Sequence, residues 1–129
     1  MKKKALLVLS DGFEDIEGVA IIDILNRVQV DLTIASLNPG PAKAANGTTI
    51  IPDTTIDLVD GQFDAIIFPG GRKNAENRAF NEKVIELTKR NYFEGKLVAA
   101  ICASPGHVLA EAANILSGKR ATGDPVFND

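Results

Sequence analysis

The only cysteine of the chain stands where an apolar run meets a turn. Residues 98–101 are apolar, Cys102 follows them, and a Ser-Pro-Gly turn begins the next segment. A nucleophile on a strand-to-helix turn is held in a strained backbone and needs small neighbours, as Ala100 and Ser104 are. A helix that starts at Pro105, with Ser104 as its cap, would favour a thiolate at its amino end. A lone cysteine can also be a small buried apolar residue, so position alone leaves both interpretations open.

Two other segments could supply groups to the same chemistry. Glu17 follows the first apolar run, and on a helix that starts near Glu14 it would point toward the cysteine. A protonated carboxyl there could donate a hydrogen bond to sulfur, with the pKa of Glu17 raised, or it could simply be one of several acids at a helix amino end. Gly70 and Gly71 follow another apolar run, and their N–H groups could bind an anion or an oxyanion. A plain tight turn accounts for a Gly-Gly pair equally well.

Several other chemistries are disfavoured. His107 lies on the segment after Cys102, about one and a half helical turns away, which favours a packing or surface role over a Cys-His dyad. The chain has no G-x-G-x-x-G motif after its first apolar run and no G-x-x-x-x-G-K-[ST] motif, the usual dinucleotide and triphosphate cradles. Histidine and cysteine do not cluster, so we expect no metal site, and we expect no cofactor.

The elements that must position these residues alternate between strands and helices. Continuous apolar runs predict strands that are covered on both faces, and helical spacing follows most of them. The expected strands are 5–9, 30–36, 64–68 and 96–101, with a short strand pair at one edge within 48–56 and the start of another strand within 118–125; the expected helices are 15–28, 74–79, 81–93 and 105–114, and 37–47 is expected to be a loop. This order predicts an α/β fold with a doubly wound, mostly parallel sheet, and strand ends that converge on one site.

Composition limits the class of protein. The length of 129 residues suits one domain, residues 1–129, and 45% apolar with 24% charged residues is typical of globular proteins. The net charge of -3, without a basic run, argues against binding to nucleic acid or to a membrane surface. One cysteine cannot form an internal disulfide, no apolar run reaches the ~20 residues of a membrane span, and the run after the initial lysines is short for a secretory signal. We therefore expect a cytoplasmic protein.

Three motifs taken together resemble the ThiJ/PfpI family. They are GFEDIE at 12–17, IIFPGG at 66–71 and VAAICASP at 98–105, in this order and at this spacing. The resemblance implies a flavodoxin-like three-layer α/β/α sandwich related to class I glutamine amidotransferases. It also implies that Cys102 is a nucleophilic, oxidation-sensitive thiol, that Glu17 is its protonated carboxyl partner, and that Gly71 and the Ala103 amide border a small anion-binding pocket.

The chain departs from the family pattern at two positions and at its end. Ala103 stands where the protease branch has a histidine, so peptidase or amidase activity loses support. Asp124 stands where many relatives of the deglycases have a histidine before proline, and a carboxylate there would repel a thiolate, so it is a possible accessory residue. Family members continue past this point. We therefore expect the domain to lack its C-terminal part, which a second segment or a partner subunit would complete.

Two functional hypotheses follow. In the first, the protein is a glutathione-independent glyoxalase or deglycase in the stress response: Cys102 attacks a small reactive carbonyl, Glu17 shuttles the proton, and the Gly71 and Ala103 amides hold the oxyanion. In the second, it is a non-enzymatic redox sensor or holdase chaperone in which an oxidant converts Cys102 to a sulfinate. A third interpretation is a family member whose site has decayed at Asp124. We also expect a homodimer.

Overall fold

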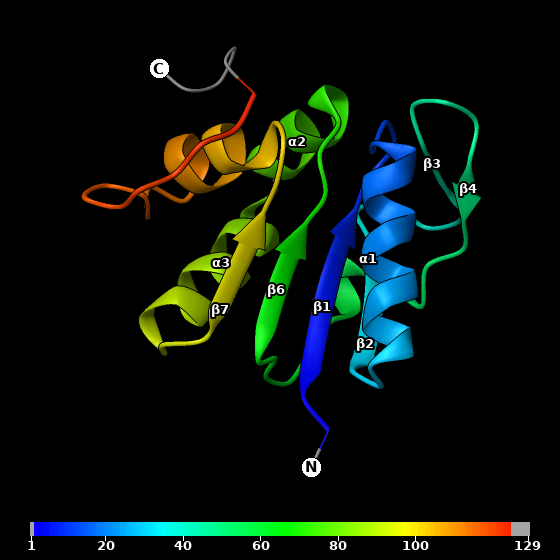
Figure 1. Ribbon diagram of the computed structural model, residues 1–129, viewed down its shortest axis with the longest axis horizontal. Coiled ribbons are helices and arrows are strands. Elements are labelled where there is room, and N and C mark those ends of the chain that lie inside the picture. The colour runs from blue at the N-terminus through cyan, green and yellow to red at the C-terminus, as the bar shows by residue number, and fades with distance from the viewer. Residues whose placement is uncertain (1, 125–129) are drawn as a thin grey trace.

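Five parallel strands form the centre of the molecule (Figure 1). The structure is a computed structural model, and it describes residues 2–124. The strands lie in the order β5-β2-β1-β6-β7, and their bounds are β1 (Lys4–Leu9), β2 (Asp31–Ser36), β5 (Thr54–Thr55), β6 (Ala65–Phe68) and β7 (Leu97–Ala100). β1 lies between β2 and β6, with Leu7 in register with Ile34 and Ile67. The apolar runs predicted as strands therefore pair as a parallel sheet.

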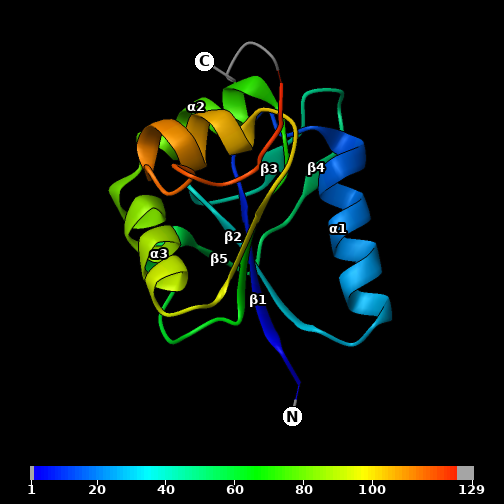
Figure 2. The ribbon, with the colours of Figure 1, turned by 60° about the vertical axis from the view of Figure 1, so that its left-hand side comes forward.

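Helices lie on both faces of this sheet, in a three-layer α/β/α arrangement (Figure 2). The helix α1 lies on one face, and the other three lie on the opposite face. Their bounds are α1 (Asp15–Arg27), α2 (Arg72–Ala79), α3 (Glu82–Phe93) and the π-helix η2 (Pro105–Ala112); a short 3-10 turn, η1 (Ile56–Leu58), follows β5. The flavodoxin-like α/β fold is thus confirmed.

The core consists of two apolar layers, because successive strand residues point to opposite faces. Leu6, Val8 and Phe68 pack toward α2, α3 and η2, in a cluster that also contains Ala103. Leu7 and Leu9 belong to the layer on the other face. Burial of β1 on both sides explains why its run is apolar without alternation.

The first helix starts as its sequence predicts. The side chain of Glu14 accepts a hydrogen bond from Glu17 N at 3.1 Å and caps the helix, and Asp15 and Glu17 place negative charge in its first turn. This cap orients the turn that carries Glu17, the candidate acid.

A small antiparallel hairpin differs from the prediction. β3 (Ala42–Lys43) pairs with β4 (Thr49–Ile50), whereas 37–47 was expected to be a loop and the short strands were placed together within 48–56. The cause is tertiary: Asp15 accepts hydrogen bonds from Asn46 N at 2.8 Å and Thr48 N at 3.0 Å. Hydrogen bonds from Thr48 hold the pKa of Asp15 at about 2.

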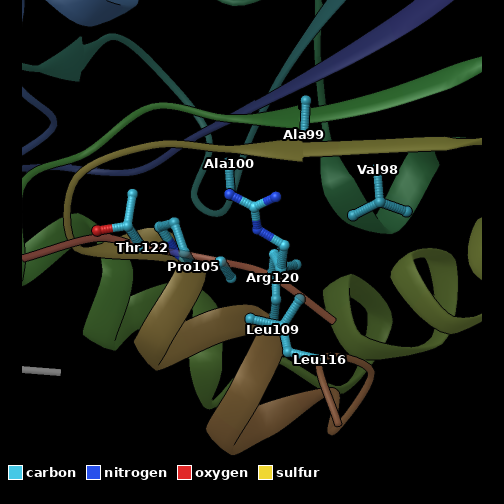
Figure 3. Close-up of a pocket in the computed structure, with 9 residues that line it drawn as sticks. Val98, Ala99, Ala100, Pro105, Leu109, Leu116, Arg120 and Thr122 are labelled. Carbon is cyan, nitrogen blue, oxygen red and sulfur yellow. The ribbon is translucent and has the colours of Figure 1, made fainter. Parts of the chain in front are cut away.

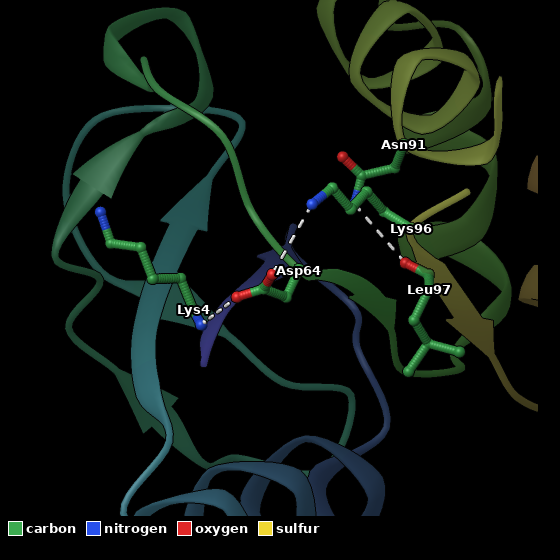
Figure 4. Close-up of polar contacts among 5 residues, drawn as sticks. All are labelled: Lys4, Asp64, Asn91, Lys96 and Leu97. Atoms are coloured by element: carbon green, nitrogen blue, oxygen red, sulfur yellow. Dashed lines mark hydrogen bonds and ion pairs between the residues drawn. The ribbon is translucent and has the colours of Figure 1, made fainter. Parts of the chain in front are cut away.

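One acidic side chain joins the amino ends of the strands (Figure 4). Asp64 accepts a hydrogen bond from Lys4 N at 2.8 Å and lies 3.8 Å from Lys96 Nζ. The bond from Lys4 lowers the pKa of Asp64. In the same region Asn91 Nδ2 donates to Leu97 O at 3.5 Å, which ties α3 to the start of β7.

The bounds of two helices and one expected strand differ from the prediction. The helix predicted for 105–114 ends at Ala112 and is a π-helix, and α2 begins at Arg72 instead of Asn74. Residues 118–124 contain no strand, and residue 125 lies outside the described residues. Within residues 2–124, no helix has the length and apolar character to cross a membrane.

Candidate functional site

Cys102 occupies the turn between β7 and η2. Its backbone has φ of 60°, a left-handed conformation that L-residues adopt at a cost, and its side chain is exposed. The turn is held from both sides, because Ile101 N donates to Phe68 O and Ser104 N donates to Ile101 O, each at 3.2 Å. The alternative interpretation, a small buried apolar cysteine, is wrong.

Gly70 brings the cysteine and the acid together. A Cβ atom at Gly70 would collide with Glu17 Oε1 and with Cys102 Cβ, and it would lie 3.0 Å from Cys102 Sγ. The two side chains therefore flank one glycine, which leaves no room for a larger residue. Gly70 N also donates to Glu17 Oε1 at 2.7 Å, so the carboxyl group is fixed on the side of the strand end that faces the thiol.

The environment of Glu17 favours its protonated form. Partial burial raises the pKa of Glu17 above its usual value, the negative charge of Glu14 adds to this rise, and the bond from Gly70 N opposes it. A carboxyl group that keeps its proton can donate a hydrogen bond or deliver that proton to a neighbouring atom.

Gly71 and Ala103 have different surroundings. Gly71 has φ of 103°, and a Cβ atom there would collide with Gly12 O and lie 2.9 Å from Glu14 N, so this glycine allows two strand-end loops to pack together. Ala103 is fully buried in the core on the η2 side. Within residues 2–124, neither backbone N–H of these two residues donates a hydrogen bond to another backbone group.

Asp124 does lie beside the cysteine. Asp124 N donates to Cys102 O at 2.6 Å, and the Asp124 carboxylate lies 3.7 Å from Arg72 Nε. Arg72 is the first residue of α2 and directly follows Gly71. This guanidinium offsets the negative charge of Asp124, and the repulsion expected between Asp124 and a thiolate is weakened accordingly.

Ser104 does not cap the helix that follows it. Its side chain makes no capping bond; Ser104 Oγ instead donates to Pro69 O at 2.7 Å and accepts from Arg78. Nothing in the sequence marks Arg78 as a buried residue, because a helix with the sequence RKNAENRA has no apolar face to predict that part of it is buried.

His107 has the packing role that its position predicts. Its side chain is 15% exposed, its Nδ1 lies 3.0 Å from Glu111 Oε2, and its ring packs edge-on against Phe80. Within residues 2–124, no group of three histidine, cysteine or acidic side chains is arranged to hold a metal ion.

A cavity of 590 Å³ lies beside β7 (Figure 3). Its lining comes from β7, η2 and the segment that follows: Val98, Ala99, Ala100, Pro105, Leu109, Leu116, Arg120, Ala121 and Thr122. Neither Cys102 nor Glu17 lines it.

Comparisons with known proteins agree with the three motifs. A model described as DJ-1/PfpI family matches residues 3–129. The chain is 35% identical to the Arabidopsis thaliana protein DJ-1 homolog A, covering 97% of this chain and 32% of that one, and 33% identical to a deglycase of Thermococcus kodakarensis, covering 98% and 75%. It superposes with a TM-score of 0.91 on a structure described as Toxoplasma gondii DJ-1, oxidized, at 32% identity, covering 97% and 68%. The chain thus spans about a third of the plant relative's length.

Proposed function

Because the chain belongs to the DJ-1/PfpI family, we propose that it acts on small reactive aldehydes through Cys102, with glyoxalase or deglycase chemistry. The name of the Thermococcus relative supports this class of reaction. The observation that carries the proposal is the exposed sulfur on a left-handed turn, separated from a carboxyl group of raised pKa by one glycine.

The first step is addition of the thiolate to the aldehyde. A bond forms between Cys102 Sγ and the carbonyl carbon, the π electron pair of the carbonyl moves to oxygen, and the proton of Glu17 then neutralises this oxygen. Glu17 is left as a carboxylate, which can take the proton from the former aldehyde carbon. With a 2-oxoaldehyde such as methylglyoxal, that proton passes to the neighbouring carbon and the hydroxyl proton passes to the neighbouring oxygen, which gives a thioester of a 2-hydroxy acid. Water then cleaves the carbon–sulfur bond, which releases the acid and restores the thiol with no external oxidant.

Two backbone amides suit the oxygen that becomes negative. Gly71 directly follows Gly70, and Ala103 directly follows Cys102. Within residues 2–124, neither of their backbone N–H groups donates to another backbone group. Backbone donors next to a nucleophile are a common way to stabilise an oxyanion. Asp124 is proposed as an accessory residue: its backbone N–H holds the Cys102 carbonyl, and Arg72 offsets the charge of its carboxylate.

The test is turnover of methylglyoxal by the purified protein and by matched variants. We expect wild-type protein to consume methylglyoxal without glutathione, Cys102→Ser to lose at least about a hundredfold in rate, and Glu17→Gln to lose a similar factor because the general acid contributes about 10²–10⁴-fold. His107→Gln, at a histidine that contacts Glu111 and Phe80, is the control and should keep full activity. Equal consumption by wild type and Cys102→Ser contradicts the proposal.

A second candidate function uses the same sulfur without turnover. The exposure of Cys102 would admit an oxidant as readily as an aldehyde, and the structurally similar Toxoplasma protein is described as oxidized. Here peroxide converts the thiolate to a sulfinate, with Glu17 donating to its oxygen. Mass spectrometry after mild peroxide treatment should find two added oxygen atoms on Cys102 in wild type and fewer in Glu17→Gln; no added oxygen contradicts this function.

A further inference from the structure

Arg78 is the largest fully buried side chain of the described residues, and it is a cation. Burial lowers the pKa of Arg78 to about 9, so the guanidinium still carries its proton at pH 7. Within residues 2–124 it forms no ion pair with a carboxylate. A buried charge without a counter-ion is costly and calls for a physical reason.

All hydrogen-bond partners of Arg78 are neutral oxygens. Nη2 donates to Pro69 O at 2.6 Å and to Ser104 Oγ. Nη1 donates to Val8 O at 3.4 Å, and Nε donates to Asn74 O at 3.1 Å. The guanidinium also lies over a ring, with its carbon 5.1 Å from the centroid of Phe68. The guanidinium of Arg78 therefore has hydrogen-bond partners, but no carboxylate among the described residues balances its positive charge.

These partners come from each of the three segments that build the candidate site. Val8 lies near the end of β1, which leads to the helix of Glu17; Pro69 precedes Gly70; Ser104 lies two residues after Cys102. The planar guanidinium of Arg78 therefore connects the ends of the three strands. Because guanidinium donors have a fixed geometry, these bonds restrict how the three segments can move relative to one another.

Asn74 extends the same network toward the acid. Its Oδ1 accepts from Ser10 N at 2.7 Å and from Ser10 Oγ at 2.6 Å, and its Nδ2 donates to Gly70 O at 3.0 Å. Asn74 and Ser10 are both buried. The carbonyl of the glycine between Glu17 and Cys102 is thus held by the same set of polar side chains.

We propose that Arg78 is a positioning residue for the Cys102 site, and that its uncompensated charge makes the site attract anionic carbonyl compounds and anionic intermediates. The inference rests on the proposed function in one respect, which is that Cys102 is a reactive thiol. The missing counter-charge is then supplied by the thiolate, the oxyanion or a carboxylate on the substrate. Carbonyl substrates that carry a carboxylate, such as 2-oxo acids of the glyoxylate type, should be preferred to neutral dicarbonyls of the same size.

Alkylation by two reagents separates charge from position. Because the chain has one cysteine, incorporation of iodoacetate (anionic) or iodoacetamide (neutral) reports on Cys102 alone. The ratio of the two rates measures the local potential. A unit charge on the order of 10 Å away, at an effective dielectric constant of about 20, changes such a ratio by about tenfold. We therefore expect Arg78→Met to lower the iodoacetate-to-iodoacetamide ratio by about tenfold.

Two variants keep the cation and change the geometry. Arg78→Lys keeps the charge without the planar fork, and Ser104→Ala removes one partner of the fork. In both we expect the two rates to fall together, by about tenfold for a displacement of a fraction of an ångström, with a ratio within twofold of wild type. Thr88→Val, which removes a buried hydrogen bond in α3 outside this network, is the control for a general loss of stability and should change neither rate.

The outcomes distinguish failure of this inference from failure of the proposed function. An unchanged ratio in folded Arg78→Met overturns the role of the charge. Wild-type rates in both Arg78→Lys and Ser104→Ala overturn the positioning role, and these two variants decide that role even if Arg78→Met does not fold. A wild-type Cys102 that reacts with neither reagent overturns the reactive thiol itself, and with it the proposed function and this inference.

Discussion

Replacing Gly70 by alanine places one methyl group between the cysteine and the acid. The added Cβ would collide with Glu17 Oε1, which belongs to a side chain that can rotate away, and with Cys102 Cβ, which moves only with its backbone. Overpacking costs about 1–3 kcal/mol, and because Cys102 Cβ cannot rotate away, we expect Gly70→Ala to cost an amount near the upper end of this range. We therefore expect a loss of about 3 kcal/mol in the free energy of unfolding, which is more than a hundredfold in the equilibrium constant.

The same variant should also lose reactivity, because Glu17 can no longer lie beside the sulfur. Urea unfolding followed by circular dichroism measures the stability, and iodoacetamide incorporation at pH 7 measures the reaction of Cys102. Gly61→Ala is the control: its φ is 81°, a Cβ there meets nothing within 4 Å, and only a backbone cost of about 1 kcal/mol is expected. A Gly70→Ala protein that is as stable as wild type, within about 0.5 kcal/mol, and equally reactive would refute the packing described here.

Three more predictions concern pH and assembly. The raised pKa of Glu17 means that the folded state holds this proton more tightly than the unfolded state; wild type should therefore lose stability as pH rises above about 4.5, and Glu17→Gln, compared by urea unfolding at several pH values, should lose less. The pKa of Asp15 is lowered to about 2, so its effect on stability has the opposite pH dependence: the contribution of Asp15 is present above pH 3.8 and is lost as pH falls toward 2. The difference in stability between wild type and Asp15→Asn should therefore close over that interval, and a constant difference contradicts this. We propose that the exposed apolar residues of α1 form a homodimer contact, so Ile24→Glu should weaken self-association at least about tenfold in sedimentation experiments, whereas Leu58→Glu, at a more exposed residue on η1, should not.

The sequence predicted the parts of the fold that depend on long apolar runs. β1 is covered on both faces, and β6 and β7 are short continuous apolar runs that end at turns, so composition alone marks all three as strands. The start of α1 near Glu14, with acidic residues in its first turn, and the end of α3 at Phe93, before Gly95 with φ of 74°, follow from local chemistry. The strand ends that converge on the site follow from the parallel order.

The features that the sequence did not predict depend on distant partners. The hairpin of β3 and β4 has two residues in each strand and is fixed by the carboxylate of Asp15, on another element. Nothing in residues 105–112 distinguishes a π-helix from an α-helix. Ser104 was expected to cap this helix because serine commonly does, but Arg78 and Pro69 bind its hydroxyl instead.

Burial of a polar side chain was the hardest feature to anticipate. The segment that carries Asn74 and Arg78 has the composition of a solvent-exposed helix, yet both residues are fully buried. Their burial depends on carbonyl oxygens presented by three separate strand ends. Such a set of acceptors exists only in the folded chain, so no pattern along the sequence indicates it.

The left-handed backbone at Cys102 has an evolutionary consequence. A position with φ of 60° suits glycine best, and any other residue there gives up roughly 1–2 kcal/mol of folding free energy. Selection for thermal robustness alone would thus drive this codon toward glycine and abolish the chemistry. A library sorted only for resistance to heat should enrich inert molecules, and one sorted for sulfur reactivity should recover cysteine at a lower melting temperature.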